Sequence, residues 1–162
     1  MMNFCTLFDS YYLHKGIATY LSLESVTDDF HLYVMAFDKD CYETLKGFGF
    51  KYMTVELVDD FETPELLAVK PTRTRAEYCW TCGSSIVYHF IIKYNLESLT
   101  YIDADMMFMS NPQILLDEIG DCSVGLSPHF EIPENINAGH FCVHFVYFKN
   151  NDDGMRSRSE ER

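Results

Sequence analysis

Two aspartates separated by one residue, Asp103 and Asp105, form the part of this sequence best suited to chemistry. They follow the apolar run at residues 99–102, which predicts a buried strand, and in an extended continuation of that strand both carboxylates point the same way. Two carboxylates at this spacing repel each other unless a cation lies between them, and hard oxygen ligands suit Mg²⁺ or Mn²⁺. We therefore predict that Asp103 and Asp105 hold a divalent cation that bridges to diphosphate oxygens.

A cation in this position would offset the charge that develops on a leaving diphosphate, which is Lewis-acid catalysis. A bare Asp-x-Asp also occurs in solvated turns that follow strands, and this alternative stays open. A second alternative is a phosphatase or phosphotransferase with Asp103 as the nucleophile. Against it, Met106 and Met107 follow the motif where a threonine or valine usually assists.

The elements around these aspartates predict an α/β fold. Helices are indicated where apolar residues recur every three or four positions, and the longest such segment opens at Thr74. Strands are indicated by six apolar runs, at residues 3–8, 30–37, 52–58, 99–102, 122–126 and 142–148. This alternation predicts a mainly parallel sheet with helices on both faces, where ligands bind beyond the carboxyl ends of the strands. Asp9 and Asp103 both fall at such ends.

Arg75 and Tyr11 suit an anionic ligand that carries an aromatic base. Arg75 lies at a helix start, where a positive charge opposes the helix dipole and favours an anionic partner such as diphosphate. An ordinary surface charge is the alternative interpretation. Tyr11 and Tyr12 follow the first strand and can stack on a uracil base, whereas core packing is the alternative for at least one of them. Tyr11 follows the strand end more closely.

The segment Asp103-Ala104-Asp105 behind its apolar strand resembles the Asp-x-Asp segment of family 8 and related retaining glycosyltransferases. The resemblance extends to residues 3–12 as the nucleotide-binding first strand, to residues 74–80 at the helix before the motif, and to residues 145–150. It thus covers roughly residues 3–150. The fold that it implies is the Rossmann-like type A fold of nucleotide-diphospho-sugar transferases.

The resemblance also implies roles for the matching residues. Asp103 would contact metal and ribose, Asp105 would hold the metal, and Arg75 would lie near the diphosphate. The surroundings of Thr6, Phe8 and Asp9 would receive the base. The predicted donor site is therefore Thr6, Phe8, Asp9, Tyr11, Arg75, Asp103, Ala104 and Asp105, with Asp103 and Asp105 as metal ligands.

The function that follows is metal-dependent transfer of a sugar from a nucleotide-diphosphate sugar, most simply a UDP-sugar. Mn²⁺ or Mg²⁺ is the expected cofactor, and the acceptor, whether glycan, lipid or protein, is unknown. A catalytically inactive nucleotide- or partner-binding module derived from the same fold is the alternative.

The sequence departs from the family pattern at its C-terminal end. Residues 1–150 are predicted to form an incomplete nucleotide-sugar-binding domain. Residues 151–162 contain no apolar side chain except Met155 and are predicted to form a polar tail that packs no further element. The strands that supply acceptor contacts and often a metal-binding histidine are missing, so a truncated product is expected. His129, His140 and His144 lack the glycine-rich setting of that histidine, and the third metal ligand stays unassigned.

The charge and the apolar content of the sequence limit which classes of partner the protein can bind. A net charge of −13 and a pI near 4.7 leave no basic stripe for a phosphate backbone, which argues against nucleic acid. No apolar run is long enough to span a bilayer and no signal peptide is recognisable, so we expect a soluble, cytoplasmic protein with six reduced cysteines.

Two cysteine patterns offer rival readings. Cys79 and Cys82 have the spacing of a redox or zinc pair, but both fall on the apolar stripe of a helix and no second Cys-x-x-Cys completes a zinc site. Core packing is the preferred interpretation. His140, Cys142 and His144 alternate along a predicted strand, although a three-ligand strand site without a fourth partner is rare.

Overall fold

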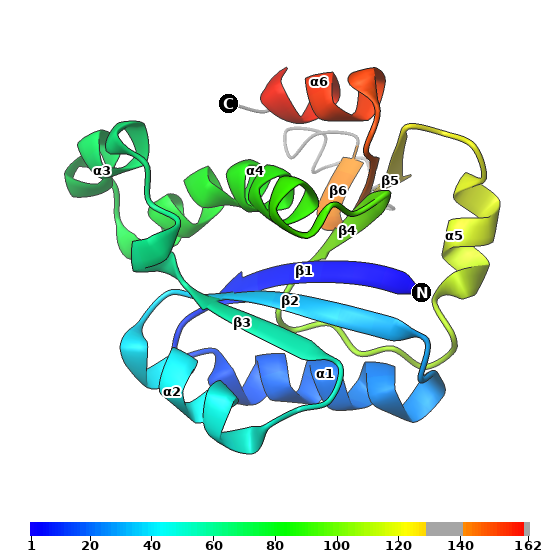
Figure 1. Ribbon diagram of the computed structural model, residues 1–162, viewed down its shortest axis with the longest axis horizontal. Helices are drawn as coiled ribbons and strands as arrows, with labels where there is room; N and C mark the ends of the chain where they lie inside the picture. The colour runs from blue at the N-terminus through cyan, green and yellow to red at the C-terminus, as the bar shows by residue number, and fades with distance from the viewer. Residues whose placement is uncertain (129–140, 161–162) are drawn as a thin grey trace, which may run out of the picture.

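The computed structural model describes residues 1–128 and 141–160. A six-stranded sheet with the order β3-β2-β1-β4-β6-β5 forms its centre (Figure 1). The strands are β1 (Met2–Phe8), β2 (Phe30–Ala36), β3 (Met53–Leu57), β4 (Ser98–Ile102), β5 (Val124–Pro128) and β6 (Phe141–Lys149). Neighbours among β1, β2, β3 and β4 pair in parallel, whereas β6 is antiparallel to both β4 and β5. Among the described strands β6 alone opposes the others, which confirms a mainly parallel sheet.

Helices cover both faces of the sheet, as predicted. They are α1 (Leu13–Val26), α2 (Lys39–Phe48), α3 (Pro64–Val69), α4 (Arg75–Tyr94), α5 (Gln113–Ile119) and α6 (Asp152–Glu160), with 3₁₀ turns η1 (Val58–Asp60) and η2 (Lys70–Thr72). In Figure 1, α1 and α2 lie on one side of the strands and α4 on the other. No helix in the described part of the chain combines the length and apolar character needed to cross a membrane.

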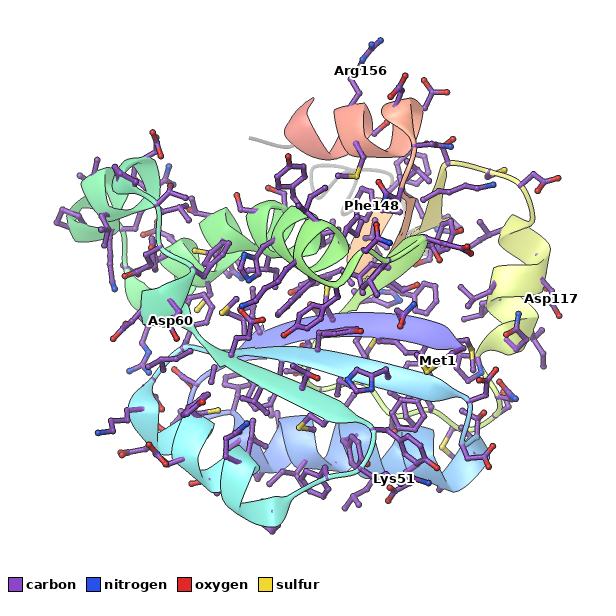
Figure 2. All side chains as sticks on the ribbon, viewed as in Figure 1. Met1, Lys51, Asp60, Asp117, Phe148 and Arg156 are labelled. Carbon is purple, nitrogen blue, oxygen red and sulfur yellow. The ribbon has the colours of Figure 1, made fainter. Side chains whose placement is uncertain are left out.

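The core forms two layers, one on each face of the sheet, and side chains fill both of them in Figure 2. On the α1 side, Tyr20 and Leu23 are fully buried together with Phe4 of β1. On the α4 side, Ile86 and Phe90 are fully buried. Each such side chain stabilises the fold by about 1.5–3 kcal/mol through burial. These two core layers fix the positions of the carboxyl ends of the strands.

Local sequence signals explain where the helices next to the carboxyl ends of the strands begin. The Asp38 carboxylate accepts a hydrogen bond from the Cys41 backbone N–H at 2.8 Å and caps α2. Thr74 and Glu77 form a reciprocal capping box at the start of α4. Because of this box, Arg75 occupies the first position of the helix.

The prediction of an unpacked tail after residue 150 is wrong for residues 152–160, which form α6. Asn151 begins the helix, because its side chain accepts a hydrogen bond from the Gly154 N–H at 2.9 Å. Gly154 is buried, and a Cβ there would collide with the backbone carbonyl of Lys149. Met155 packs against the core layer of α4. A glycine allows the helix to approach the backbone closely, so one apolar side chain is enough to dock it.

Candidate functional site

A cavity of about 590 Å³ opens at the carboxyl ends of β1 and β4, beside the first turns of α1 and α4. This volume lies in the range of small-molecule sites. Seven of the eight predicted donor-site residues line it: Phe8, Asp9, Tyr11, Arg75, Asp103, Ala104 and Asp105. The exception is Thr6, whose side chain is buried inside β1 and does not line the cavity.

The Asp-x-Asp segment is a turn and not an extension of β4, so the two carboxylates have different surroundings. The strand ends at Ile102, and Ala104 and Asp105 form the turn. Asp103 stays half-buried, with its backbone N–H donating to the His144 carbonyl at 3.0 Å. Asp105 is exposed, and its Oδ2 lies 3.2 Å from Lys15 Nζ. The expectation that the segment continues β4 in extended geometry is therefore wrong, although both residues still line one cavity.

Burial raises the pKa of the Asp103 carboxyl above its usual value. The negative charge of Asp105 adds to this rise, while a hydrogen bond from Tyr101 and the charge of His144 act against it. The charged form of Asp103 is therefore less favoured than that of a free carboxyl. A positive ion between the two carboxylates would relieve both contributions.

One stripe of α1 holds the loop that carries the two aspartates. Lys15, Thr19 and Ser22 are spaced four and three residues apart and therefore share a helix face. The buried Thr19 hydroxyl lies 2.9 Å from the Ala104 carbonyl oxygen and 2.8 Å from that of Met106. Ser22 Oγ accepts a hydrogen bond from the backbone N–H of Phe108 at 3.0 Å. The turn is thus fixed by side chains that come roughly ninety positions earlier in the chain.

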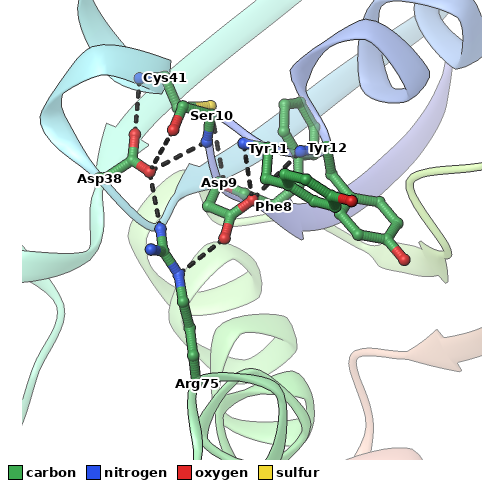
Figure 3. A network of polar contacts seen from close by, with 8 residues as sticks. All are labelled: Phe8, Asp9, Ser10, Tyr11, Tyr12, Asp38, Cys41 and Arg75. Atoms are coloured by element: carbon green, nitrogen blue, oxygen red, sulfur yellow. Dashed lines mark hydrogen bonds and ion pairs between the residues drawn. The ribbon is translucent and has the colours of Figure 1, made fainter.

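Arg75 joins α4 to the loops that follow β1 and β2. Its Nε lies 2.7 Å from Asp9 Oδ2, and one of its terminal nitrogens lies 2.7 Å from Asp38 Oδ2. Figure 3 shows Arg75 extending from α4 toward both carboxylates, with Ser10 and Cys41 donating to Asp38. Burial by itself raises the pKa of Asp38, but these hydrogen bonds and the one from Arg75 outweigh it, so that the pKa lies below its usual value.

Asp9 orders the turn that presents the tyrosines. Its Oδ1 accepts hydrogen bonds from the backbone N–H groups of Tyr11 at 3.0 Å and Tyr12 at 3.2 Å (Figure 3). The Tyr11 side chain lines the cavity and is 80% exposed, so core packing does not apply to it. The ring is thus available to a flat ligand.

Comparisons with solved structures show that several glycosyltransferases share the fold of this chain. Mouse xyloside xylosyltransferase 1 in its apo form superposes with a TM-score of 0.67 at 13% identity, over 98% of this chain and 71% of that one. The galactosyltransferase LgtC, in complex with donor and acceptor sugar analogs, gives a TM-score of 0.60 at 15% identity, over 98% of this chain and 60% of that one. The mannosyltransferase PcManGT from Pyrobaculum calidifontis, in complex with GDP-Man and Mn²⁺, gives 0.53 at 11% identity, over 91% and 44%.

The chain has the type A glycosyltransferase fold. Its sequence is 32% identical to the uncharacterized proteins YfnF and YfnD of Bacillus subtilis, over 93% and 89% of this chain. It spans about half the length of these relatives, 54% of YfnF and 48% of YfnD. No family model matches the sequence.

The side chains of Asp103 and Asp105 are suitable ligands for a divalent cation, but they provide only two ligand residues. Both ligands are carboxylates, as Mg²⁺ and Mn²⁺ prefer. Residues 1–128 and 141–160 contain no group of three or more His, Cys, Asp or Glu side chains placed to share a metal ion. A cation held by the two aspartates would therefore complete its shell with ligand oxygens or water.

Among the histidines and cysteines weighed from the sequence, Cys79 lines the cavity. His129 and His140 lie outside the described residues. His144 and Cys142 contact each other through Nδ1 and Sγ. All six cysteines are free. Burial raises the pKa of Cys79 and of Cys82 to about 11, which keeps both thiols protonated at neutral pH and opposes a redox role.

Sequence reasoning missed four residues of this site: Lys15, Asp38, Trp80 and Tyr101. Trp80 and Tyr101 line the cavity, and Trp80 is 77% exposed on α4. Lys15 had a usable signal, because a lysine in the first turn of a helix opposes the dipole and calls for an anion, as was argued for Arg75. Asp38 caps α2, and this local role gives no sign of a role in the site. Its second partner, Arg75, is 37 positions away, and local patterns do not reveal such a contact.

Proposed function

We propose that the cavity binds a nucleoside-diphosphate sugar, most simply a UDP-sugar, together with Mn²⁺ or Mg²⁺, and that the sugar is transferred to an acceptor. One observation carries the proposal. A cavity of about 590 Å³ brings Asp9, Arg75, Asp103 and Asp105 together at the strand ends, although three different elements supply them. In open parallel sheets, ligands bind beyond the carboxyl ends of the strands.

The charges around the cavity support the need for a cation. Asp9, Asp103 and Asp105 line it, and against them stand the guanidinium of Arg75 and the amine of Lys15. Arg75 is already paired with two carboxylates, Asp9 and Asp38. A diphosphate entering this site alone would meet net negative charge, so a divalent ion on Asp103 and Asp105 is required to receive it. The Mn²⁺ bound to the structurally similar PcManGT agrees with this requirement.

The proposal assigns a role to residues that line the cavity and were predicted from the sequence. The exposed ring of Tyr11 stacks on the base, beside Phe8 and Asp9. Asp103 and Asp105 hold the cation, which supplies charge stabilisation to the leaving diphosphate when bound. Arg75 lies on the cavity wall near the diphosphate and keeps Asp9 in position. Acceptor contacts are left to residues outside this group.

Binding of UDP with and without Mn²⁺ tests the proposal. Trp80, the sole tryptophan of the sequence, lines the cavity, so its fluorescence reports ligand entry alongside calorimetry. The wild type is expected to bind UDP only with Mn²⁺, and an Asp103→Ala, Asp105→Ala double variant is expected to lose this binding. The matched control is Asp59→Ala, Asp60→Ala, which removes the same charge from exposed positions in η1. Equal UDP binding without metal, or by the double variant, would contradict the proposal.

A second measurement separates an enzyme from an inactive binding module. Incubation of the wild type with a UDP-sugar and Mn²⁺ should release UDP by slow hydrolysis even when no acceptor is present. Metal-dependent release that the double variant lacks supports catalysis. Binding without any release would favour the inactive module.

A further inference from the structure

Lys15 places a positive charge where the cation of the proposed function would act. Its Nζ lies 3.2 Å from Asp105 Oδ2 and 4.3 Å from the centroid of the Tyr12 ring. Tyr12 and Asp105 both line the cavity, so the end of the lysine side chain lies between two of its wall residues. The position is set by α1, whose Thr19 one turn later holds the turn that carries Asp105.

The contact between Lys15 and Asp105 is exchangeable. The two side chains are 39% and 49% exposed, and ion pairs at such exposure are weak because water and salt screen them. The neighbouring pairs around Arg75 are better protected, since the Asp9 and Asp38 side chains are only 14% and 26% exposed. Of these three ion pairs, the Lys15–Asp105 pair is therefore the easiest for a divalent ion to displace.

A cation on Asp105 changes what Lys15 encounters. The ammonium group is then repelled by the ion that has taken its partner. Asp9 and Asp38 are engaged by Arg75. The diphosphate oxygens of the proposed donor would lie next to the cation held by Asp105. The four-carbon stem of a lysine is flexible enough to follow this shift, and its ammonium group is a good point-charge partner for phosphate.

We propose that Lys15 is a diphosphate-binding residue that Asp105 holds beside the cavity until a divalent cation binds to Asp105. This inference rests on the proposed function and adds a residue to it. In the donor-free state Lys15 neutralises Asp105 and competes with the cation. In the loaded state Lys15 supplies the positive charge that Arg75, bound to two carboxylates, does not. Cation and donor are therefore expected to bind cooperatively.

The test compares Lys15→Met with Lys46→Met, which removes a lysine from the exposed surface of α2. Calorimetry measures Mn²⁺ alone, and then UDP at saturating Mn²⁺. Lys15→Met is expected to bind Mn²⁺ alone about two- to five-fold more tightly, because the competitor is gone. It is expected to bind UDP about tenfold more weakly, because a charged phosphate contact is lost. Lys46→Met should match the wild type in both titrations.

Tighter Mn²⁺ binding together with weaker UDP binding distinguishes this role from a structural one. Loss of a structural role would leave both affinities unchanged or weaken both. Lys15→Arg keeps the charge and is expected to retain UDP binding within about threefold, and thermal melting confirms that each variant is folded. If Lys15→Met leaves UDP affinity unchanged, or weakens binding of Mn²⁺ alone, the inference is overturned while the proposed function stands. If the folded wild type does not bind Mn²⁺ and UDP at all, the proposed function falls, and this inference with it.

Discussion

The Thr19 hydroxyl lies 2.9 Å from the carbonyl oxygen of Ala104, the residue between the two aspartates. This hydrogen bond joins the middle of α1 to the turn after β4, and it is buried. Thr19→Val keeps the side-chain shape but removes the donor. We expect the free energy of unfolding to fall by about 1–2 kcal/mol, because the buried Ala104 carbonyl loses its hydrogen-bond donor. Chemical denaturation measures this loss, and Mn²⁺-dependent UDP binding should weaken with it.

Thr44→Val is the matched control for Thr19. The Thr44 hydroxyl also donates to a backbone carbonyl, that of Asp40, but on the exposed side of α2. Its replacement should change the free energy of unfolding by no more than about 0.5 kcal/mol and leave ligand binding intact. Equal losses in the two variants would mean that the turn does not depend on Thr19.

Gly16 allows α1 to lie directly against the aromatic ring of Phe8, which lines the cavity. A Cβ at Gly16 would collide with this ring, whereas a Cβ at Gly47 in α2 meets nothing within 4 Å. Gly16→Ala is therefore expected to lower the free energy of unfolding by about 1–3 kcal/mol. Gly47→Ala should raise it by up to about 1 kcal/mol through helix propensity. Thermal unfolding of both variants decides the matter, and a stabilising Gly16→Ala would refute the close packing.

Arg75 and Arg73 flank the start of α4 but differ in their partners. Arg75 pairs with Asp9 and Asp38, while Arg73 lies exposed in the turn before the helix. Arg75→Met leaves two partly buried carboxylates without their shared cation and should cost about 1–2 kcal/mol of unfolding free energy. Arg73→Met should cost less than about 0.5 kcal/mol. Similar values for both would show that the network contributes nothing to stability.

Glu56 of β3 gives the fold a dependence on acid. Burial by itself raises the pKa of this carboxyl, but hydrogen bonds from Lys93, Tyr94 and His89 outweigh it and leave the pKa below its usual value. The contacts measure 2.8, 2.6 and 2.8 Å. A depressed carboxyl pKa stabilises the fold above the pKa of the unfolded chain, and this stabilisation is lost as the pH falls through the folded-state value.

Glu56→Gln should therefore lower the free energy of unfolding at pH 7 by about 2 kcal/mol. It should also flatten the decline in stability between about pH 5 and pH 3 relative to the wild type. Glu43→Gln, an exposed change in α2, serves as the control and should leave the profile unchanged. Parallel wild-type and Glu56→Gln profiles would assign the acid sensitivity to other carboxyls.

The sheet, the main helices and most of the cavity wall could be predicted because their signals are local. Apolar runs indicated the strands, and the apolar positions that recur every three or four residues from Thr74 onward indicated α4. The spacing of Asp103 and Asp105 after an apolar strand singled out this pair, and the resemblance to family 8 enzymes implied their roles. α6 was missed because the prediction rested on polar composition alone, and the Asn151 cap and the buried Gly154 leave no apolar mark in the sequence.

The pairings inside the site were beyond local reasoning. Arg75 was expected to be free for a diphosphate, but two aspartates from separate loops hold it. Lys15 meets Asp105 across 90 positions, and Thr19 meets Ala104 across 85. Such contacts follow from how α1 packs against one face of the sheet, where Gly16 lies against Phe8.

The central claim is that the cavity at the ends of β1 and β4 holds a divalent cation next to a nucleoside diphosphate. Paramagnetic broadening of backbone amide signals by Mn²⁺ in the presence of UDP locates such an ion directly, without any variant. The account predicts that broadening centres on the Asp103–Asp105 turn, Asp9 and Lys15, and that Mg²⁺ in excess removes it. Broadening centred on other carboxylates, such as Asp28 and Asp29 before β2, or none at these residues, would contradict it.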